Sequence, residues 1–230
     1  MKFGIVTFPG SNCDHDTFHA IHDVLQEEAV YLWHKDHDLA GSDVVILPGG
    51  FSYGDYLRPG AIARFSPIMT EVIAHARRGG PVLCICNGFQ IACEAGLLPG
   101  ALLRNESLRF VSEPVRLRVE NADTMFTNRY EAGQLLTMPI AHGDGRYTAD
   151  DDTLDKLEGE GQIVLRYMLS AGDADEYWSP NGAMRAIAGI VSASGNVMGL
   201  MPHPERAVDS LLGSSDGIGV FESMLARVAA

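Results

Sequence analysis

Cysteine is scarce in this sequence, and long apolar runs are missing from it. Four cysteines in 230 residues are too few for a disulfide-stabilised scaffold. Three of them, Cys84, Cys86 and Cys93, lie close together, which suits a reducing compartment. No apolar run approaches the roughly 18 residues of a membrane span, and no charged-then-apolar leader follows Met1. The sequence therefore predicts a cytoplasmic protein that has no membrane partner.

Basic residues are also in deficit. Lysine and arginine number 17 against 30 acidic residues, which gives a formal net charge of −13. A protein that binds nucleic acid through the phosphate backbone needs a basic surface, so no nucleic-acid partner is expected. The remaining composition, with 46% hydrophobic and 20% charged residues, is that of an ordinary globular protein. Without an internal repeat or a linker, we expect a single domain over residues 1–230.

Strand-like and helix-like segments alternate in the first half of the chain. Short apolar runs at 2–7, 30–33, 43–47 and 81–85 indicate strands, and helices are expected over 12–28 and 60–78. This alternation predicts an α/β fold of three layers around a doubly wound, mostly parallel sheet. The second half is more β-rich, with strands expected at 115–120, 136–141 and 163–168, a hairpin over 186–201 and helices beginning at Asp150 and Ser214.

The segment from Val82 to Gln90 passes from strand to helix without a loop. An apolar strand ends at Cys86-Asn87-Gly88, and a helical segment follows at once. Such a corner holds its residue in a strained conformation with the side chain exposed, which is the nucleophile-elbow geometry. The corner also lies at the positive end of a helix, which favours thiolate over thiol. Cys86 is therefore the candidate nucleophile, although most free cysteines are simply buried core residues.

Two further segments supply the partners that such a nucleophile needs. In Met201-Pro202-His203-Pro204-Glu205, the prolines favour an extended backbone, which would place His203 and Glu205 on one side. A base oriented by a carboxylate within reach of a thiol is a generalised catalytic triad. Gly49 and Gly50 follow a buried strand, and a backbone amide there, together with that of Asn87, would form an oxyanion hole.

These segments resemble a known family. Cys86-Asn87-Gly88-Phe89-Gln90, the Pro48-Gly49-Gly50 loop and His203-Pro204-Glu205 look like the class I (triad) glutamine amidotransferases. The stretches 8–14, 47–58, 140–147, 180–182 and 199–206 are similar to those of the free-standing, PurQ-type glutaminase subunits of phosphoribosylformylglycinamidine synthase. Cys84 departs from the glycine usual in the family's elbow, and Ser179, Ala183 and Met184 also differ from the usual residues.

The resemblance implies a role for each matching residue. Cys86 would attack the side-chain amide of glutamine to give a γ-glutamyl thioester and ammonia, with His203 moving protons and Glu205 orienting His203. The oxyanion hole would involve Gly49, Gly50 and Asn87, and the glutamine pocket would be lined by Gln90, His142 and Gly143.

The resemblance also implies partners. Ammonia would pass to a large synthetase subunit that uses ATP and Mg to convert formylglycinamide ribonucleotide to formylglycinamidine ribonucleotide in purine biosynthesis. A small third subunit would complete the complex. This chain itself would hold no cofactor and no metal.

Three other interpretations remain open. A metal site could use Cys84, Cys86 and Cys93, although their spacing is not the paired Cys-x-x-Cys of structural zinc. A stand-alone cysteine hydrolase of the same fold would also carry an elbow cysteine, but the His-Pro-Glu segment favours the amidotransferase. A non-catalytic interaction subunit would have no need of Cys86, His203 and Glu205 together.

Overall fold

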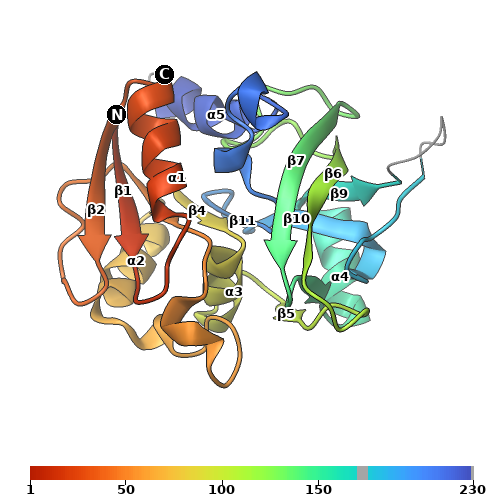
Figure 1. Ribbon diagram of the computed structural model, residues 1–230, viewed down its shortest axis with the longest axis horizontal. Helices are drawn as coiled ribbons and strands as arrows, with labels where there is room; N and C mark the ends of the chain where they lie inside the picture. The colour runs from red at the N-terminus through yellow and green to blue at the C-terminus, as the bar shows by residue number, and fades with distance from the viewer. Residues whose placement is uncertain (170–175, 229–230) are drawn as a thin grey trace.

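A single mixed sheet organises the chain. The computed structural model describes residues 1–169 and 176–228. Its main sheet has nine strands in the order β2-β1-β3-β4-β11-β10-β9-β6-β7, and a separate pair joins β5 to β8 (Figure 1). The strands are β1 (Lys2–Thr7), β2 (Glu28–Trp33), β3 (Val44–Leu47), β4 (Val82–Ile85), β5 (Ala101–Leu103), β6 (Val111–Val119), β7 (Leu135–His142), β8 (Arg146–Thr148), β9 (Ile163–Met168), β10 (Ile187–Val191) and β11 (Val197–Leu200).

The part of the sheet that carries β1 to β4 is parallel and doubly wound, as predicted. Every residue of β3 and β4 is buried, because helices cover both faces of this region. The chain moves outward from β1 to β2 and in the opposite direction from β3 to β4. Right-handed crossovers then require α1 and α2 to cover opposite faces, and Figure 1 shows α1 in front of β1 and α2 behind it.

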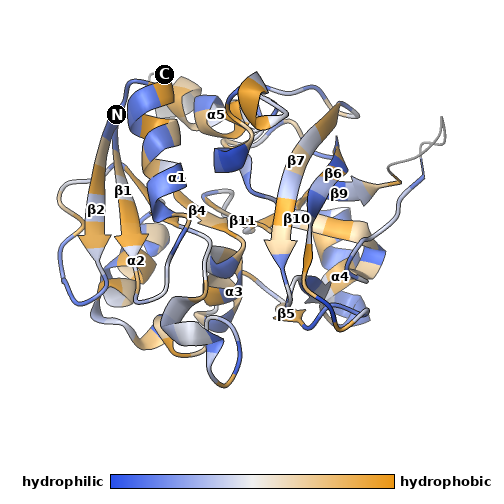
Figure 2. Cartoon of the chain, viewed as in Figure 1, coloured by the Kyte–Doolittle hydropathy of each residue, from blue (hydrophilic) through white to orange (hydrophobic). Residues whose placement is uncertain are grey.

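Strand β11 connects the two parts of the sheet. It runs parallel to β4 on one side and antiparallel to β10 on the other. From β10 onward the strands are antiparallel, so the predicted β-rich second half and its hairpin are confirmed. In Figure 2 the central strands are largely hydrophobic, whereas α1 carries hydrophilic residues among its hydrophobic ones. No helix in the described part of the chain is long and apolar enough to cross a membrane.

The helices differ from the sequence prediction mainly at their ends. Helix α1 (Asp14–Phe18) continues as a π-helix over His19–Val24 and stops short of the expected end. Helix α2 (Pro67–Arg77) starts later than predicted, because a proline forces the preceding Ser66 into an extended conformation. A short 3-10 turn, Ala63–Phe65, takes the place of the expected first turns.

The remaining helices lie close to their predicted positions. Helix α3 (Asn87–Glu94) follows β4 directly, and α5 (Ile218–Val228) begins after the predicted Ser214; Ala229 lies outside the described residues. Helix α4 (Asp151–Gly159) starts where predicted, because the Asp150 carboxylate accepts a hydrogen bond from the Thr153 amide at 2.8 Å. The sequence prediction missed β5 and β8, which are too short to show a hydrophobic period.

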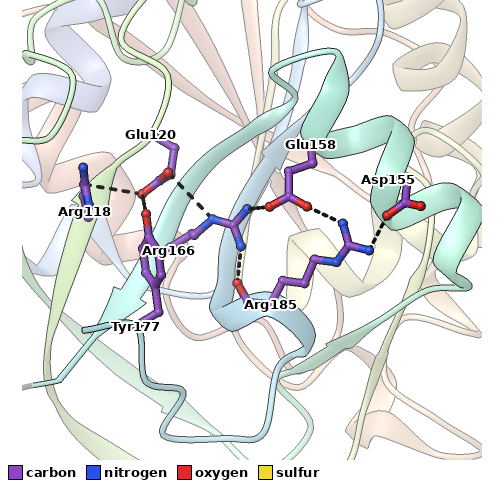
Figure 3. Close-up of polar contacts among 7 residues, drawn as sticks. All are labelled: Arg118, Glu120, Asp155, Glu158, Arg166, Tyr177 and Arg185. Atoms are coloured by element: carbon purple, nitrogen blue, oxygen red, sulfur yellow. Dashed lines mark hydrogen bonds and ion pairs between the residues drawn. The ribbon is translucent and has the colours of Figure 1, made fainter. Parts of the chain in front are cut away.

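A network of charged side chains joins α4 to the segments beside it (Figure 3). Arg166 of β9 is buried and donates to Glu158 of α4 and to the backbone carbonyl of Arg185. Arg185 in turn donates to Glu158 and Asp155. These contacts hold the segment before β10, which also carries residues near the site described next.

Candidate active site

Cys86 occupies a strained corner between β4 and α3. Its backbone has φ 50° and ψ −102°, a conformation that costs a non-glycine residue about 1–3 kcal/mol. Gly88 lets the helix pack closely, since an added Cβ there would lie 2.0 Å from the Leu47 carbonyl oxygen. Cys84 is fully buried within β4 and keeps the strand regular. The predicted elbow therefore forms even though Cys84 stands where the family usually has glycine.

His203 and Glu205 form a buried pair beside the elbow. The Nδ1 atom of His203 lies 2.6 Å from Oε1 of Glu205, and the two residues are 1% and 2% exposed. The predicted extended conformation of this segment was wrong, because Pro204–Arg206 forms a 3-10 turn. The amide of His203 donates to the Pro139 carbonyl of β7 at 2.8 Å, which fixes the start of that turn. The pair thus meets across a tight turn.

The charge state of His203 follows from its neighbours. Burial alone would lower its pKa, but the Glu205 carboxylate and the Cys86 thiolate outweigh burial and hold the pKa of His203 well above its ordinary value. Among the described residues, Nε2 of His203 has no hydrogen-bond partner. The Glu205 carboxylate therefore favours the protonated form of the imidazole.

The glycine loop after β3 packs against this pair. A Cβ added to Gly49 would lie 2.7 Å from Cε1 of His203, so only glycine leaves room for the imidazole. Gly50 has φ +142° and lines the same cavity as Cys86. The loop is also tied to the elbow, because the Ser52 amide donates to the Asn87 side chain at 3.0 Å. The structure therefore brings both glycines to the site, with Gly49 behind the histidine and Gly50 on the cavity wall.

A cavity of about 320 Å³ opens in front of Cys86. Its walls contain carboxylates and guanidinium groups as well as apolar rings, and its lining residues are Gly50, Phe51, Asp55, Cys86, Gln90, Arg104, Leu108, Arg109, Phe110, Ala141, His142, Gly143 and Asp144. Burial and, to a lesser extent, the nearby Asp144 raise the pKa of Asp55 to about 6, although a hydrogen bond from Asn87 opposes the shift.

Gln90, His142 and Gly143 all line this cavity, as the family resemblance implies. The side chain of Gln90 is already engaged, since it donates to the Asp144 carbonyl at 2.6 Å and accepts from Asn87 at 2.7 Å. It therefore braces the cavity wall.

The ring of His142 is engaged as well. Its Nδ1 lies 3.2 Å from Asn105 Oδ1, and its Nε2 lies 3.4 Å from Asn181 Nδ2. Burial, with a smaller effect of His203, lowers the pKa of His142 to about 4, so the ring is neutral. Asn105 also accepts from the Gly145 amide, at 3.0 Å. The polar group behind the wall is thus His142, Asn105 and Asn181.

Sequence reasoning missed several cavity residues. Asp55 lies inside the conspicuous 47–58 stretch, so its position was visible although its role was not. Arg104 and Arg109 of the cavity, and Asn105 behind it, follow β5, and no motif marks them. Cys84, Cys86 and Cys93, the ligands of the alternative metal site, do not come close enough together to share a metal. In the described part of the chain, the group that does is Cys13, His203 and Glu205.

Comparison with known proteins identifies the family. Residues 1–216 match the CobB/CobQ-like glutamine amidotransferase domain. The chain is 58% identical over 228 residues to "Phosphoribosylformylglycinamidine synthase subunit PurQ" of Salinibacter ruber, covering 99% of this chain and 97% of that one. The protein of the same name from Chlorobaculum tepidum is 58% identical over 229 residues, covering 100% and 98%. The chain belongs to the PurQ-type glutamine amidotransferases.

Solved structures place this PurQ-type amidotransferase in the same fold. A chain in the structure of PurLQS from Thermotoga maritima superposes with a TM-score of 0.87 at 46% identity, covering 99% of this chain and 98% of that one. A second glutamine amidotransferase from Thermotoga maritima reaches a TM-score of 0.60 at 16% identity, covering 99% and 97%, which shows a shared fold alone. The fold and the family implied by the sequence motifs are both confirmed.

Proposed function

We propose that this chain is the glutamine-hydrolysing subunit of phosphoribosylformylglycinamidine synthase. Its task is to release ammonia from glutamine for a large synthetase subunit, in a complex that also contains a small third subunit. The observation that carries the proposal is the buried His203–Glu205 pair, 2.6 Å apart, beside a strained elbow cysteine in a chain 58% identical to named PurQ subunits. A scaffold subunit would not need to maintain that strain.

The chemistry is a two-step acyl transfer. The Cys86 thiolate attacks the side-chain carbonyl carbon of glutamine, and the resulting tetrahedral intermediate collapses as His203 gives its proton to the departing nitrogen. Ammonia leaves, and a γ-glutamyl thioester remains on Cys86. His203 then takes a proton from water as the water attacks the thioester, which returns glutamate and the thiolate. Glu205 keeps the imidazole oriented in both steps.

The oxyanion is held by backbone amides. We assign the donors to Gly50, which lines the cavity, and to Asn87, whose amide belongs to the first turn of α3 and has no carbonyl partner within the helix. Gly49 acts differently: its missing Cβ makes room for His203.

The cavity offers charges that match the far end of glutamine. Asp55 and Asp144 suit the α-ammonium group, and Arg104 and Arg109 suit the α-carboxylate. A substrate held at that end presents its amide to Cys86 in a fixed position, which supplies much of the rate gain in acyl transfer.

Cofactors and location follow from this role. ATP and Mg would be used by the synthetase subunit, where the amide acceptor is activated, and hydrolysis of glutamine by thiol, imidazole and carboxylate requires neither. Purine synthesis would place the complex in the cytoplasm.

The test is labelling with a diazo-ketone analogue of glutamine, followed by peptide mass mapping with and without excess glutamine and with and without the partner subunits. We expect one adduct, on Cys86, prevented by glutamine. Cys93 is the internal control, because its thiol lies on α3 against the Pro99 carbonyl and lines no part of the cavity. No adduct even in the assembled complex would refute glutamine as the substrate.

Partner use is tested separately in the assembled complex. Cys86→Ala should abolish glutamine-dependent synthesis while ammonia-dependent synthesis continues. Retention of glutamine-dependent synthesis would remove Cys86 from the mechanism.

A further inference from the structure

A second buried thiol lies against the catalytic pair and has no part in the chemistry above. Cys13 precedes α1 and is 2% exposed. Its Sγ lies 3.2 Å from Asn12 Oδ1 and accepts a hydrogen bond from Nη2 of Arg206 at 3.2 Å. Its amide donates to the Gly49 carbonyl, so the thiol is held in place by the same loop that packs on His203.

Cys13, His203 and Glu205 form a compact set of ligand atoms. One atom from each, a thiol sulfur, an imidazole nitrogen and a carboxylate oxygen, lies within 4.8 Å of the other two. All three side chains are more than nine-tenths buried. Among the described residues, Nε2 of His203 and Oε2 of Glu205 have no hydrogen-bond partner. Buried polar atoms usually have one, so these atoms retain unused capacity to bind a ligand.

The donor set and its spacing suit a soft divalent cation. Zinc binds thiolate, imidazole and carboxylate at about 2.0–2.3 Å in a tetrahedral arrangement, which puts its ligand atoms about 3.5 Å apart. The observed spread of up to 4.8 Å therefore requires a contraction of about 1.3 Å or less. The thiolate of Cys13 and the carboxylate of Glu205 balance two positive charges. Arg206 does not add an uncompensated charge, because it is paired with Asp16 at 2.8 Å.

We propose that Cys13, His203 and Glu205 form a site for a thiophilic divalent cation, Zn²⁺ in particular, and that occupation of this site stops glutamine hydrolysis. On binding, the sulfur of Cys13 gives up its proton to solvent, and so does the histidine nitrogen that becomes a ligand. The fourth coordination position is open to water.

Inhibition is expected whichever imidazole nitrogen of His203 binds the cation. If the cation takes Nδ1, it replaces the proton shared with Glu205, and if it takes Nε2, it occupies the atom that must carry protons to and from the substrate. Binding itself does not depend on the proposed function; only the inhibition rests on it. Cys86 is not a member of the ligand set.

Binding is tested with Co²⁺ as the spectroscopic probe on the reduced full chain, with Zn²⁺ in competition. The wild type should show a thiolate-to-cobalt charge-transfer band and one equivalent of bound metal, displaced by Zn²⁺. Cys13→Ser and Cys13→Ala should each lose the band and bind Zn²⁺ at least about tenfold more weakly. The band should persist in Cys93→Ser and in Cys86→Ser, because neither residue is a proposed ligand.

Two variants of Cys13 guard against misfolding, and their circular dichroism and thermal unfolding should match the wild type before the bands are compared. A band that survives in both Cys13 variants, or that vanishes in Cys86→Ser, would overturn the site. The absence of any band in the wild type would overturn it equally.

The consequence for activity is measured with glutaminase assays in the assembled complex. Zn²⁺ should inhibit the wild type and Cys93→Ser, and inhibition should weaken by at least about tenfold in Cys13→Ala, which keeps the metal-free activity. Equal inhibition of wild type and Cys13→Ala would overturn the inhibitory role. Metal binding without any glutaminase activity would instead count against the proposed function and leave the binding site standing.

Discussion

His203 and Glu205 are two residues apart in sequence, and their side chains meet at 2.6 Å because the backbone between them turns in a 3-10 conformation. Both side chains are buried, so water does not compete for this contact. A short charged contact in such surroundings fixes the ring far more firmly than an exposed one would. The orientation of the His203 ring is thus determined within a single turn.

Changing Glu205 tests that contact. Glu205→Gln retains an oxygen that can accept from Nδ1 but removes the negative charge that stabilises the imidazolium, so kcat should fall by about 10²-fold or more while KM changes little. Glu205→Ala, which removes both, should be slower still. Steady-state glutamine hydrolysis in the assembled complex measures both constants, and equal kcat for wild type and Glu205→Gln would contradict the orienting role.

Gly49 should be intolerant of a single methyl group. In Gly49→Ala the new Cβ would lie 2.7 Å from Cε1 of His203, so the imidazole must shift, and a misplacement of about 1 Å can cost about 10²-fold in rate. Gly159→Ala is the matched control, because its added Cβ meets nothing within 4 Å and alanine favours a helix. Glutaminase rates and thermal unfolding of both variants would be compared, and an unchanged kcat in Gly49→Ala would show that the ring has room to move.

Asp55 should make stability depend on pH in a defined direction. Its pKa of about 6 in the folded protein exceeds the usual value, so the folded state holds this proton more tightly than the unfolded chain does. Its contribution is most favourable below the unfolded pKa and is lost as the pH rises through about 6. The charged groups around it are Asp144, Arg104 and Arg109, which line the same cavity.

Asp55→Asn removes that dependence and keeps an oxygen for the Asn87 side chain. The Tm of Asp55→Asn minus the Tm of the wild type should be larger at pH 7.5 than at pH 4.5. Thermal unfolding of both proteins across this range measures the difference. A constant offset in Tm over the whole range would show that the carboxyl group has an ordinary pKa.

The network of charged side chains in Figure 3 should stabilise the folded protein, with Arg166 as its main contributor. Arg166→Met removes the donor to the Arg185 carbonyl and to Glu158, and leaving a buried acceptor unpaired costs about 1–3 kcal/mol. Arg58→Ala is the control, because Arg58 is an exposed partner of Glu94 and such pairs are worth about 0–1 kcal/mol. Denaturant unfolding gives the free energy of unfolding of both variants. Equal losses in Arg166→Met and Arg58→Ala would show that the network contributes no more than a surface ion pair.

The parts of the fold that the sequence predicts well are those in which one force dominates. The apolar runs of β3 and β4 indicate strands because both faces are buried, and the direct passage from β4 to α3 indicates the elbow because no loop residues intervene. The start of α2 was misplaced, since Pro67 controls Ser66 more strongly than the helical pattern before it.

Other features depend on contacts that are distant in sequence. In the described part of the chain, β5 and β8 pair only with each other, and neither is long enough to show a hydrophobic period. The polar group of His142, Asn105 and Asn181 comes from three separate segments, so no local pattern marks it. The turn at Pro204 was expected to be extended, and the contact with Glu205 was nevertheless correct because a 3-10 turn also brings these side chains together.

The pairing of β11 with β4 has a consequence for how the protein loses activity. Cys86 directly follows β4, its amide donates to the Leu200 carbonyl at the end of β11, and His203 comes shortly after β11. The proposed nucleophile and base are therefore attached to adjacent strands in the middle of the sheet, away from the edge strands β2 and β7. Amide hydrogens in this pair of strands should exchange only through global opening, so heat inactivation should coincide with complete unfolding rather than precede it.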